Sequence, residues 1–426
     1  VQDAAHRAGF FTARTYLNTV RTGLAQVIDQ VATPQCAWTT FLEQSARLWL
    51  DKDSPLAMSV ERFVSEFIGP NMMWQRDWTH SLQELDSLPK DSRLPSRVQK
   101  RLAWQAFAEF TYLSRRGRTL DNIGKATLAP RLDDISRAAD ALLPGLHETF
   151  GIRHADRRTV VQWLWGFVCH LRQRGAVAHP ELMAYARDGN IYALTQTQGR
   201  KEWLPGMGER TPHPMFLSMG RTRGFDHLVN PQAPTFYQTW LNATLGANGL
   251  LPNKADEAIY TEAIKALEHA GVLLRIDVDP VDAIALNPAA LVLETRLSRL
   301  VSAQGKRGLT VPADAADALL GMPCLDAPQD NYAEKMDAGG WLAKRFSRGE
   351  LRRVFSAEHT GLLQRDQREA LELRFKAKLQ HPWYENLLSA TPTLEMGVDI
   401  GDLSSVLLCS VPARRTSAPA TRSTSP

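Results

Sequence analysis

The sequence predicts an α/β fold: an incomplete parallel sheet near the C-terminus, preceded by a long and mainly α-helical stretch. In residues 387–412, two short apolar runs at 387–388 and 406–409 flank a polar loop that carries Gly397 and Asp399. In a parallel sheet, the polar loop that follows a strand forms a ligand site at the carboxyl end of that strand. The order of strand, polar loop and strand seen here fits this arrangement. Through most of the preceding chain, apolar residues recur every three or four positions, which is typical of amphipathic helices.

Length and composition narrow the class of protein. A chain of 426 residues is long enough for about three domains. Hydrophobic residues at 44% and charged residues at 23% are ordinary for globular proteins and argue against disordered and membrane classes. Four scattered cysteines form no ligand pairs and no disulfide framework, which favours a cytoplasmic location. We expect no membrane partner.

The N-terminal part is predicted to be helical. Apolar residues at helical spacing run through residues 1–31, and Pro34 follows their end. Residues 36–88 continue this pattern with breaks near Pro55 and Pro70, and a joint rich in Pro, Asp and Ser at 87–95 separates the next helix.

Residues 93–131 form the most basic stretch of the chain, with nine Lys and Arg residues against Glu109 and Asp121. Such an excess is typical of a surface that binds a phosphate backbone, although a solvated helix face is the alternative. We expect the turn SRRGR at 114–118 to contact phosphate through Arg115, Arg116 and Arg118. Three aromatic residues nearby, at spacings of three, are expected in the core rather than as base-stacking platforms: Trp104, Phe107 and Phe110.

Residues 234–291 are predicted to be a small module of two helices, at 236–245 and 255–270, and two strands, at 272–278 and 283–286. This order is similar to a winged helix, a common duplex-binding fold. Four acidic residues on the second helix argue against its lying deep in a groove, so a spacer role stays open. Further helices are expected at 341–350 and 364–378, with a strand at 351–357 between them.

Three sequence runs resemble the superfamily-two DEAD/DEAH-box helicases, in particular the large bacterial YprA- and Lhr-related type. The run ATPTLEMGVDIGD at 390–402 resembles motif V, EHTGLLQRDQREALELRF at 358–375 resembles the segment before it, and VQDAAHRAGFF at 1–11 resembles the end of motif IV. Their order matches the family. The resemblance implies that both ends of the chain build one RecA-like lobe, the second of the two lobes of such helicases, and that the interior is a large insertion.

The expected organisation follows from this resemblance. The segments are 1–32, start of the lobe; 33–233, helical insertion; 234–291, winged-helix-like module; 292–340, degenerate zinc-ribbon-like connector; 341–412, remainder of the lobe; and 413–426, a disordered tail. The tail lacks the arginine-finger motif VI, and we expect it to reflect a truncation or a shifted reading frame. In the connector, GMPC at 321–324 is similar to part of a four-cysteine zinc site. Because no other cysteine flanks it and zinc needs about four ligands, we predict no metal.

The resemblance also implies roles for single residues. It implies ATP contacts at Gly397 and Asp399. It implies nucleic-acid contacts at the following positions: Thr391; His359, Thr360, Gly361 and Arg368; and Gln2 and Asp3. Two of these residues also admit a purely structural role, Asp399 as a cap of its turn and Arg368 as the ion-pair partner of Glu372 on the same helix.

The function expected from these features is that of a fragment of an ATP-dependent helicase or translocase acting on DNA or RNA. The sequence contains no phosphate loop of the form G-x-x-x-x-G-K-S/T and no DExH acids. ATP and Mg²⁺ would therefore be shared with a missing first lobe, and the chain alone is expected to be inactive. The alternative is a non-catalytic nucleic-acid-binding scaffold with a degenerate RecA-like remnant.

Overall fold

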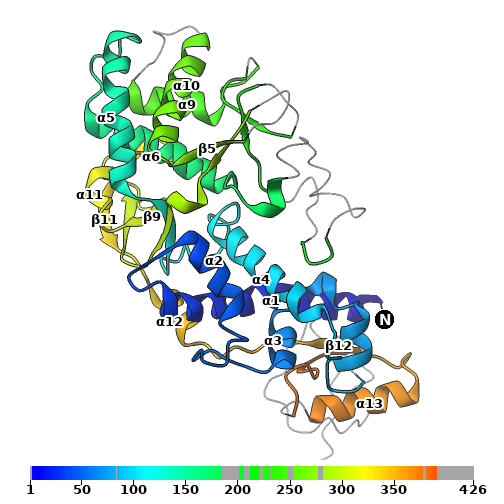
Figure 1. Cartoon of the computed structure of the whole chain (residues 1–426). Helices are drawn as coiled ribbons and strands as arrows, with labels where there is room; N and C mark the ends of the chain where they lie inside the picture. Colours follow the sequence, from blue (N-terminus) through cyan, green and yellow to red (C-terminus); the bar gives the residue numbers. More distant parts are fainter. Residues whose placement is uncertain are drawn as a thin grey trace, which may run out of the picture. The chain divides into compact units, whose positions relative to one another are not determined.

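The chain divides into two compact units, which are described separately (Figure 1). The computed structural model describes residues 2–82, 84–183, 201–205, 212–220, 224–230, 232–246, 253–276, 282–377 and 380–390. Phe11–Val354 form the large unit, whereas the first ten residues group with the chain from Phe355 onward into the small unit. The sequence had placed these boundaries after residues 32 and 340. Among the described helices, none has the length and apolar character needed to cross a membrane.

Helices α1 (Gln2–Val31), α2 (Trp38–Arg47), α3 (Val60–Phe67) and α4 (Leu94–Phe110) begin the chain. Short helical turns lie between α3 and α4, at η1 (Pro70–Met72) and η2 (Asp77–Leu82). Both α2 and α3 pack on α4, and the rings of Trp38 and Phe41 meet Phe110 edge-on at 6.1 and 5.9 Å. The predicted core residues Trp104, Phe107 and Phe110 are fully buried, so this prediction is confirmed.

Strands from distant parts of the sequence complete this region. Strand β7 (Leu291–Glu294) lies between β1 (Gln35–Ala37) and β2 (Thr127–Pro130), antiparallel to both. A further antiparallel sheet has the order β10-β11-β8-β9 and is made of β8 (Leu297–Ser302), β9 (Gly308–Pro312), β10 (Pro323–Cys324) and β11 (Ala327–Asp337), with α11 (Ala316–Leu319) between β9 and β10. The interior of the chain is therefore richer in strands than the sequence predicted.

A second core of the large unit is built from α5 (Leu132–Glu148), α6 (Arg157–Gln173), α9 (Phe236–Leu245) and α10 (Asn253–His269). Helix α5 packs on α6 and α10, and α6 packs on α9. The sheet beside them has the order β4-β3-β6-β5 and comprises β3 (Leu217–Ser218), β4 (Asp226–His227), β5 (Leu273–Ile276) and β6 (Ala283–Leu286). Two short turns, η3 (Pro180–Leu182) and η4 (Pro288–Ala290), also belong to the large unit.

The helices and strands predicted for 234–291 are present, but they do not form a separate core. Trp163 of α6 donates through Nε1 to the Tyr260 hydroxyl of α10 at 3.3 Å, and Trp240 of α9 donates to the Trp163 carbonyl at 2.9 Å. The sheet also takes in β3 and β4, which precede residue 234. The module's apolar face is therefore covered by α5 and α6.

The small unit contains a strand, a helix and a parallel strand: β12 (Ser356–His359), α13 (Arg365–Lys376) and β13 (Leu387–Ala390). The register pairs Ser356 with Leu387 and His359 with Ala390. Strand β13 confirms the strand predicted at 387–388, and α13 confirms the helix predicted at 364–378.

One boundary was predicted wrongly, because residues 351–355 are not a strand and β12 begins only at Ser356. The backbone N–H of Arg353 donates to the Glu66 carboxylate at 2.8 Å instead of to a neighbouring strand. The helix before it, α12 (Trp341–Arg348), agrees with the prediction for 341–350.

Candidate nucleic-acid interface

The basic turn, residues 114–118, follows α4 and exposes Arg115, Arg116 and Arg118. Gly117 adopts a φ of +67°, and a Cβ placed there would meet nothing within 4 Å. The positive φ alone therefore favours glycine at this position. Thr119 donates through its hydroxyl to the Ser114 carbonyl, which closes the turn.

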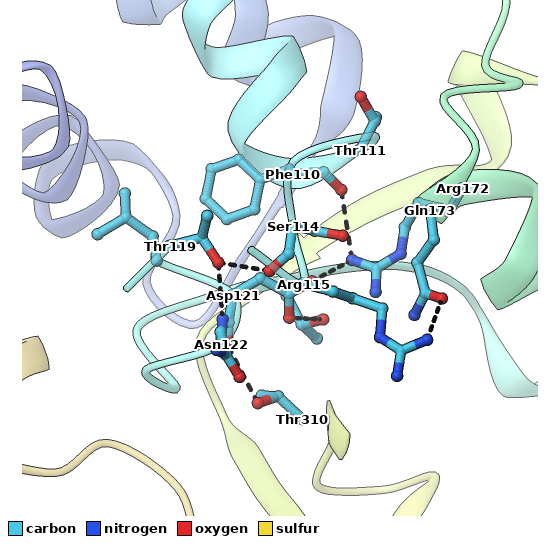
Figure 2. Close-up of polar contacts among 12 residues, drawn as sticks. Phe110, Thr111, Ser114, Arg115, Thr119, Asp121, Asn122, Arg172, Gln173 and Thr310 are labelled. Carbon is cyan, nitrogen blue, oxygen red and sulfur yellow. Dashed lines mark hydrogen bonds and ion pairs between the residues drawn. The ribbon is translucent and has the colours of Figure 1, made fainter. Parts of the chain in front are cut away.

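A buried ion pair lies beneath the basic turn (Figure 2). Arg172 of α6 donates through Nη1 to Asp121, and the two side chains are 4% and 7% exposed. The Thr127 hydroxyl donates to the second carboxylate oxygen of Asp121 at 3.0 Å, and the Thr310 hydroxyl donates to the Asp121 carbonyl at 3.0 Å. Arg172 and Asp121 therefore tie the turn to α6, β2 and β9. Breaking such a pair leaves an uncompensated buried charge.

A second buried carboxylate, that of Glu109, holds the backbone that follows the basic turn. Glu109 accepts from the backbone N–H of Leu120 and from Nε of Arg21, both at 2.8 Å. Burial raises the pKa of the Glu109 carboxyl, and the Arg21 guanidinium opposes this shift. Asn122 donates to the Gly117 carbonyl at 2.7 Å. The basic turn is thus fixed by side chains that closely follow it, Thr119 and Asn122, and by elements distant in sequence.

Arg115 differs from its two neighbours. Its guanidinium bonds Asp326 at 2.8 Å and Gln173 at 3.1 Å, so much of its charge is compensated. For Arg116 and Arg118, the described residues provide no ion-pair partner, and both side chains are exposed. Of the three arginines predicted to contact phosphate, Arg116 and Arg118 are the two that remain available to bind it.

The basic stretch 93–131 as a whole carries less available charge than its composition indicates. Arg97 pairs with Glu202 at 2.6 Å, Lys125 pairs with Asp29, and Arg101 is buried with Asn71 as a partner. Together with Arg115, four of the nine cations are occupied within the protein. The count of charges from sequence therefore overstated the surface that a phosphate backbone would meet.

The carboxyl end of β12 is the second place where predicted residues gather. His359 and Thr360 are 3% and 1% exposed. Nε2 of His359 lies 2.9 Å from Glu372 Oε1 on α13. Among the described residues, three buried polar atoms here have no hydrogen-bond partner: Oε2 of Glu358, Nδ1 of His359 and Oγ1 of Thr360. Unpaired buried polar groups are uncommon and are often found at functional sites.

The remaining predicted residues are placed as follows. Gly361 is exposed in the turn after β12, and Arg368 is half-buried on α13. Within the described part of the chain Arg368 forms no ion pair with Glu372, which instead holds His359. Gln2 and Asp3 lie in the first turn of α1, where only the backbone is described. Thr391, Gly397 and Asp399 lie outside the described residues.

Cys324 of the predicted zinc-ribbon-like connector is a buried free thiol on β10. Burial raises its pKa to about 11, with Asp330 and Asp326 adding to the shift. Over the residues that the structure describes, no three His, Cys, Asp or Glu side chains form a group able to hold a metal ion.

Sequence reasoning missed the contacts that support both places, that of Asp121 with Arg172 near the basic turn and that of Glu372 with His359. Asp121 and Arg172 are 51 positions apart, and no local pattern joins them.

Searches against protein-family models, curated proteins and solved structures found no match to this chain. The family resemblance therefore stays a prediction.

Proposed function

We propose that this chain is part of an ATP-dependent nucleic-acid helicase or translocase and supplies nucleic-acid contacts from its second RecA-like lobe. The parallel pair β12–β13, with α13 between the strands in sequence, supports this proposal most directly. In open α/β sheets, ligands bind beyond the carboxyl ends of the strands. His359 and Thr360 lie at that end of β12, and the run that resembles motif V follows β13 in the sequence.

In this proposal ATP with Mg²⁺ is shared with a first lobe that carries the phosphate loop and the magnesium-binding acids. Gly397 and Asp399, the two residues assigned to ATP, are outside the described residues. The described atoms without partners near β12 are one hydroxyl, one imidazole nitrogen and one carboxylate oxygen, which do not amount to a triphosphate site. We therefore assign no step of hydrolysis to the described residues.

Photocrosslinking tests the proposal. A single-stranded oligonucleotide with photoreactive bases is irradiated with the chain, and the crosslinked peptides are identified by mass spectrometry. We expect crosslinks in peptides containing Thr360 and Gly361 and in the peptide containing Arg116 and Arg118. We also expect no nucleic-acid-stimulated ATP hydrolysis by the chain alone. Robust hydrolysis, or crosslinks confined to other peptides, would contradict the proposal.

The second candidate is a non-catalytic nucleic-acid-binding scaffold, and the firmly held basic turn favours it. Arg116 and Arg118 are exposed on a segment fixed by Asp121 and Glu109, independently of any nucleotide. Under this alternative, crosslinks form at the basic turn and none form at Thr360 or Gly361. The same experiment therefore separates the two candidates.

A further inference from the structure

One face of α12 combines an exposed tryptophan with three cations. Three cations follow Trp341 by three, four and seven positions: Lys344, Arg345 and Arg348. At these spacings all four residues share one side of the helix. Trp341 is 67% exposed, and the Arg345 guanidinium lies 5.3 Å from its ring centroid. We call these four residues the α12 face.

The α12 face is held in place by the rest of the large unit. Ala343, on another side of the helix, is buried at 6% exposure. Gln26 of α1 donates through Nε2 to the Gly349 carbonyl at 2.9 Å, which anchors the end of the helix. The side chains of the α12 face therefore project from a fixed element.

The positive charge of the α12 face is not compensated by any acidic side chain in the part of the chain that the structure describes. Among the described residues, Lys344, Arg345 and Arg348 form no ion pair, in contrast to Lys125 and Arg115 in the basic stretch. A solvated helix face usually mixes both signs, and an exposed tryptophan is uncommon away from binding surfaces. Uncompensated cations beside an exposed indole are complementary to a phosphate backbone with accessible bases.

The backbone that leads into α12 lies against the segment that follows the basic turn. Gly124 has a φ of +73°, and a Cβ there would come within 2.6 Å of the Gly339 nitrogen. Gly339 is two residues before Trp341, and Gly124 is six residues after Arg118. The segment that leads into α12 and the segment that follows the basic turn are thus in contact within the large unit.

We infer that the α12 face binds single-stranded nucleic acid, with Trp341 stacking on a base and Lys344, Arg345 and Arg348 contacting phosphates. Single strands are favoured over duplex because stacking on a side chain requires a base that is free of its neighbours. This inference rests on the proposed nucleic-acid function and adds a contact surface to it.

Charge removal with a matched control tests the cations. In one variant Lys344, Arg345 and Arg348 are replaced by Gln; in the control Lys52, Lys90 and Lys306, which are also exposed, are replaced by Gln. Binding of a labelled oligothymidylate of about 20 nucleotides is followed by fluorescence anisotropy over a salt series. Loss of three phosphate contacts should weaken binding roughly 10- to 100-fold and make the slope of log K against log salt shallower by about 2. The control should bind within about twofold of the unmodified chain.

Replacing the indole tests stacking. Trp341→Ala should weaken oligothymidylate binding roughly tenfold, whereas Trp341→Phe, which keeps a ring, should retain most of the affinity. Since Trp341 is exposed, neither change should alter the circular dichroism spectrum or the melting temperature.

The outcomes separate this inference from the proposed function. If the unmodified chain binds the oligonucleotide but the α12 variants bind as tightly as the control, the inference is overturned and the proposed function stands. If the unmodified chain binds no oligonucleotide, both fail. Binding to vesicles with anionic phospholipid, lost in the α12 variant and without any oligonucleotide binding, would assign the α12 face to membranes and overturn the inference.

Discussion

Replacing Asp121 by Ala should destabilise the large unit strongly, because it removes the carboxylate that compensates buried Arg172. The Arg172 residue is 3% exposed, and Asp121 also accepts from Thr127 at 3.0 Å. Removing one partner of a buried ion pair costs about 3–5 kcal/mol of unfolding free energy. For a unit of this size, that loss lowers the melting temperature by roughly 5 °C.

The assay is thermal unfolding followed by tryptophan fluorescence, which Trp163 and Trp165 on the same helix as Arg172 should report. Asp140→Ala is the matched control, because Asp140 pairs with Arg157 at the surface, where the side chains are 53% and 56% exposed. This control should leave the melting temperature unchanged.

The double replacement Asp121→Ala with Arg172→Met should regain much of the stability lost by Asp121→Ala, since neither charge of this pair is then left buried. If Asp121→Ala unfolds at the temperature of the unmodified chain, or if the Asp140→Ala control loses as much, the account of this ion pair is wrong.

Two further predictions concern the large unit. Burial raises the pKa of Glu66 to about 7 from its ordinary 4.5, so the folded state holds a proton that the unfolded state has released between these pH values. The free energy of unfolding should therefore fall as pH rises through this window. Glu66→Gln should remove this fall and raise the free energy of unfolding by up to about 3 kcal/mol at pH 8. Urea unfolding at several pH values checks this, and equal pH slopes for both proteins would refute it. Gly166→Ala should destabilise the packing of α6 on α9 by about 1–3 kcal/mol, because the new Cβ would lie 2.0 Å from Trp240 Cζ2. The higher helix propensity of Ala opposes this loss only in part. An unchanged urea midpoint would contradict the prediction.

Local structure was the part that the sequence predicted well. Helix α9 occupies the predicted residues, because Thr235 and Gln238 form a capping box at its start and Gly246 ends it with a φ of +61°. Helix α13 and strand β13 were also predicted, since apolar spacing and turn residues act over a few positions. The strand predicted at 351–357 begins only at Ser356, and a carboxylate distant in the sequence, Glu66, binds the Arg353 backbone instead.

The candidate site was predicted only in part. Exposed arginines at the turn 114–118 could be expected from sequence, but the compensation of Arg115 by Asp326 could not. His359 and Thr360 were chosen through the family resemblance, and the structure adds that both are buried and that Glu372 binds His359. The residues assigned to ATP, Gly397 and Asp399, lie outside the described part of the chain.

The sequence by itself determined helices such as α9, α12 and α13 and which stretch is basic, because propensity, capping and apolar spacing are local properties of the chain. Only the tertiary structure decided which charges are available to a partner. Arg116, Arg118 and the α12 face remain exposed, whereas Arg101 is buried and Arg115 is paired. The physical reason is that burial and ion pairing depend on groups brought together from far apart in the sequence, such as Asp121 and Arg172, and no local pattern encodes such a meeting.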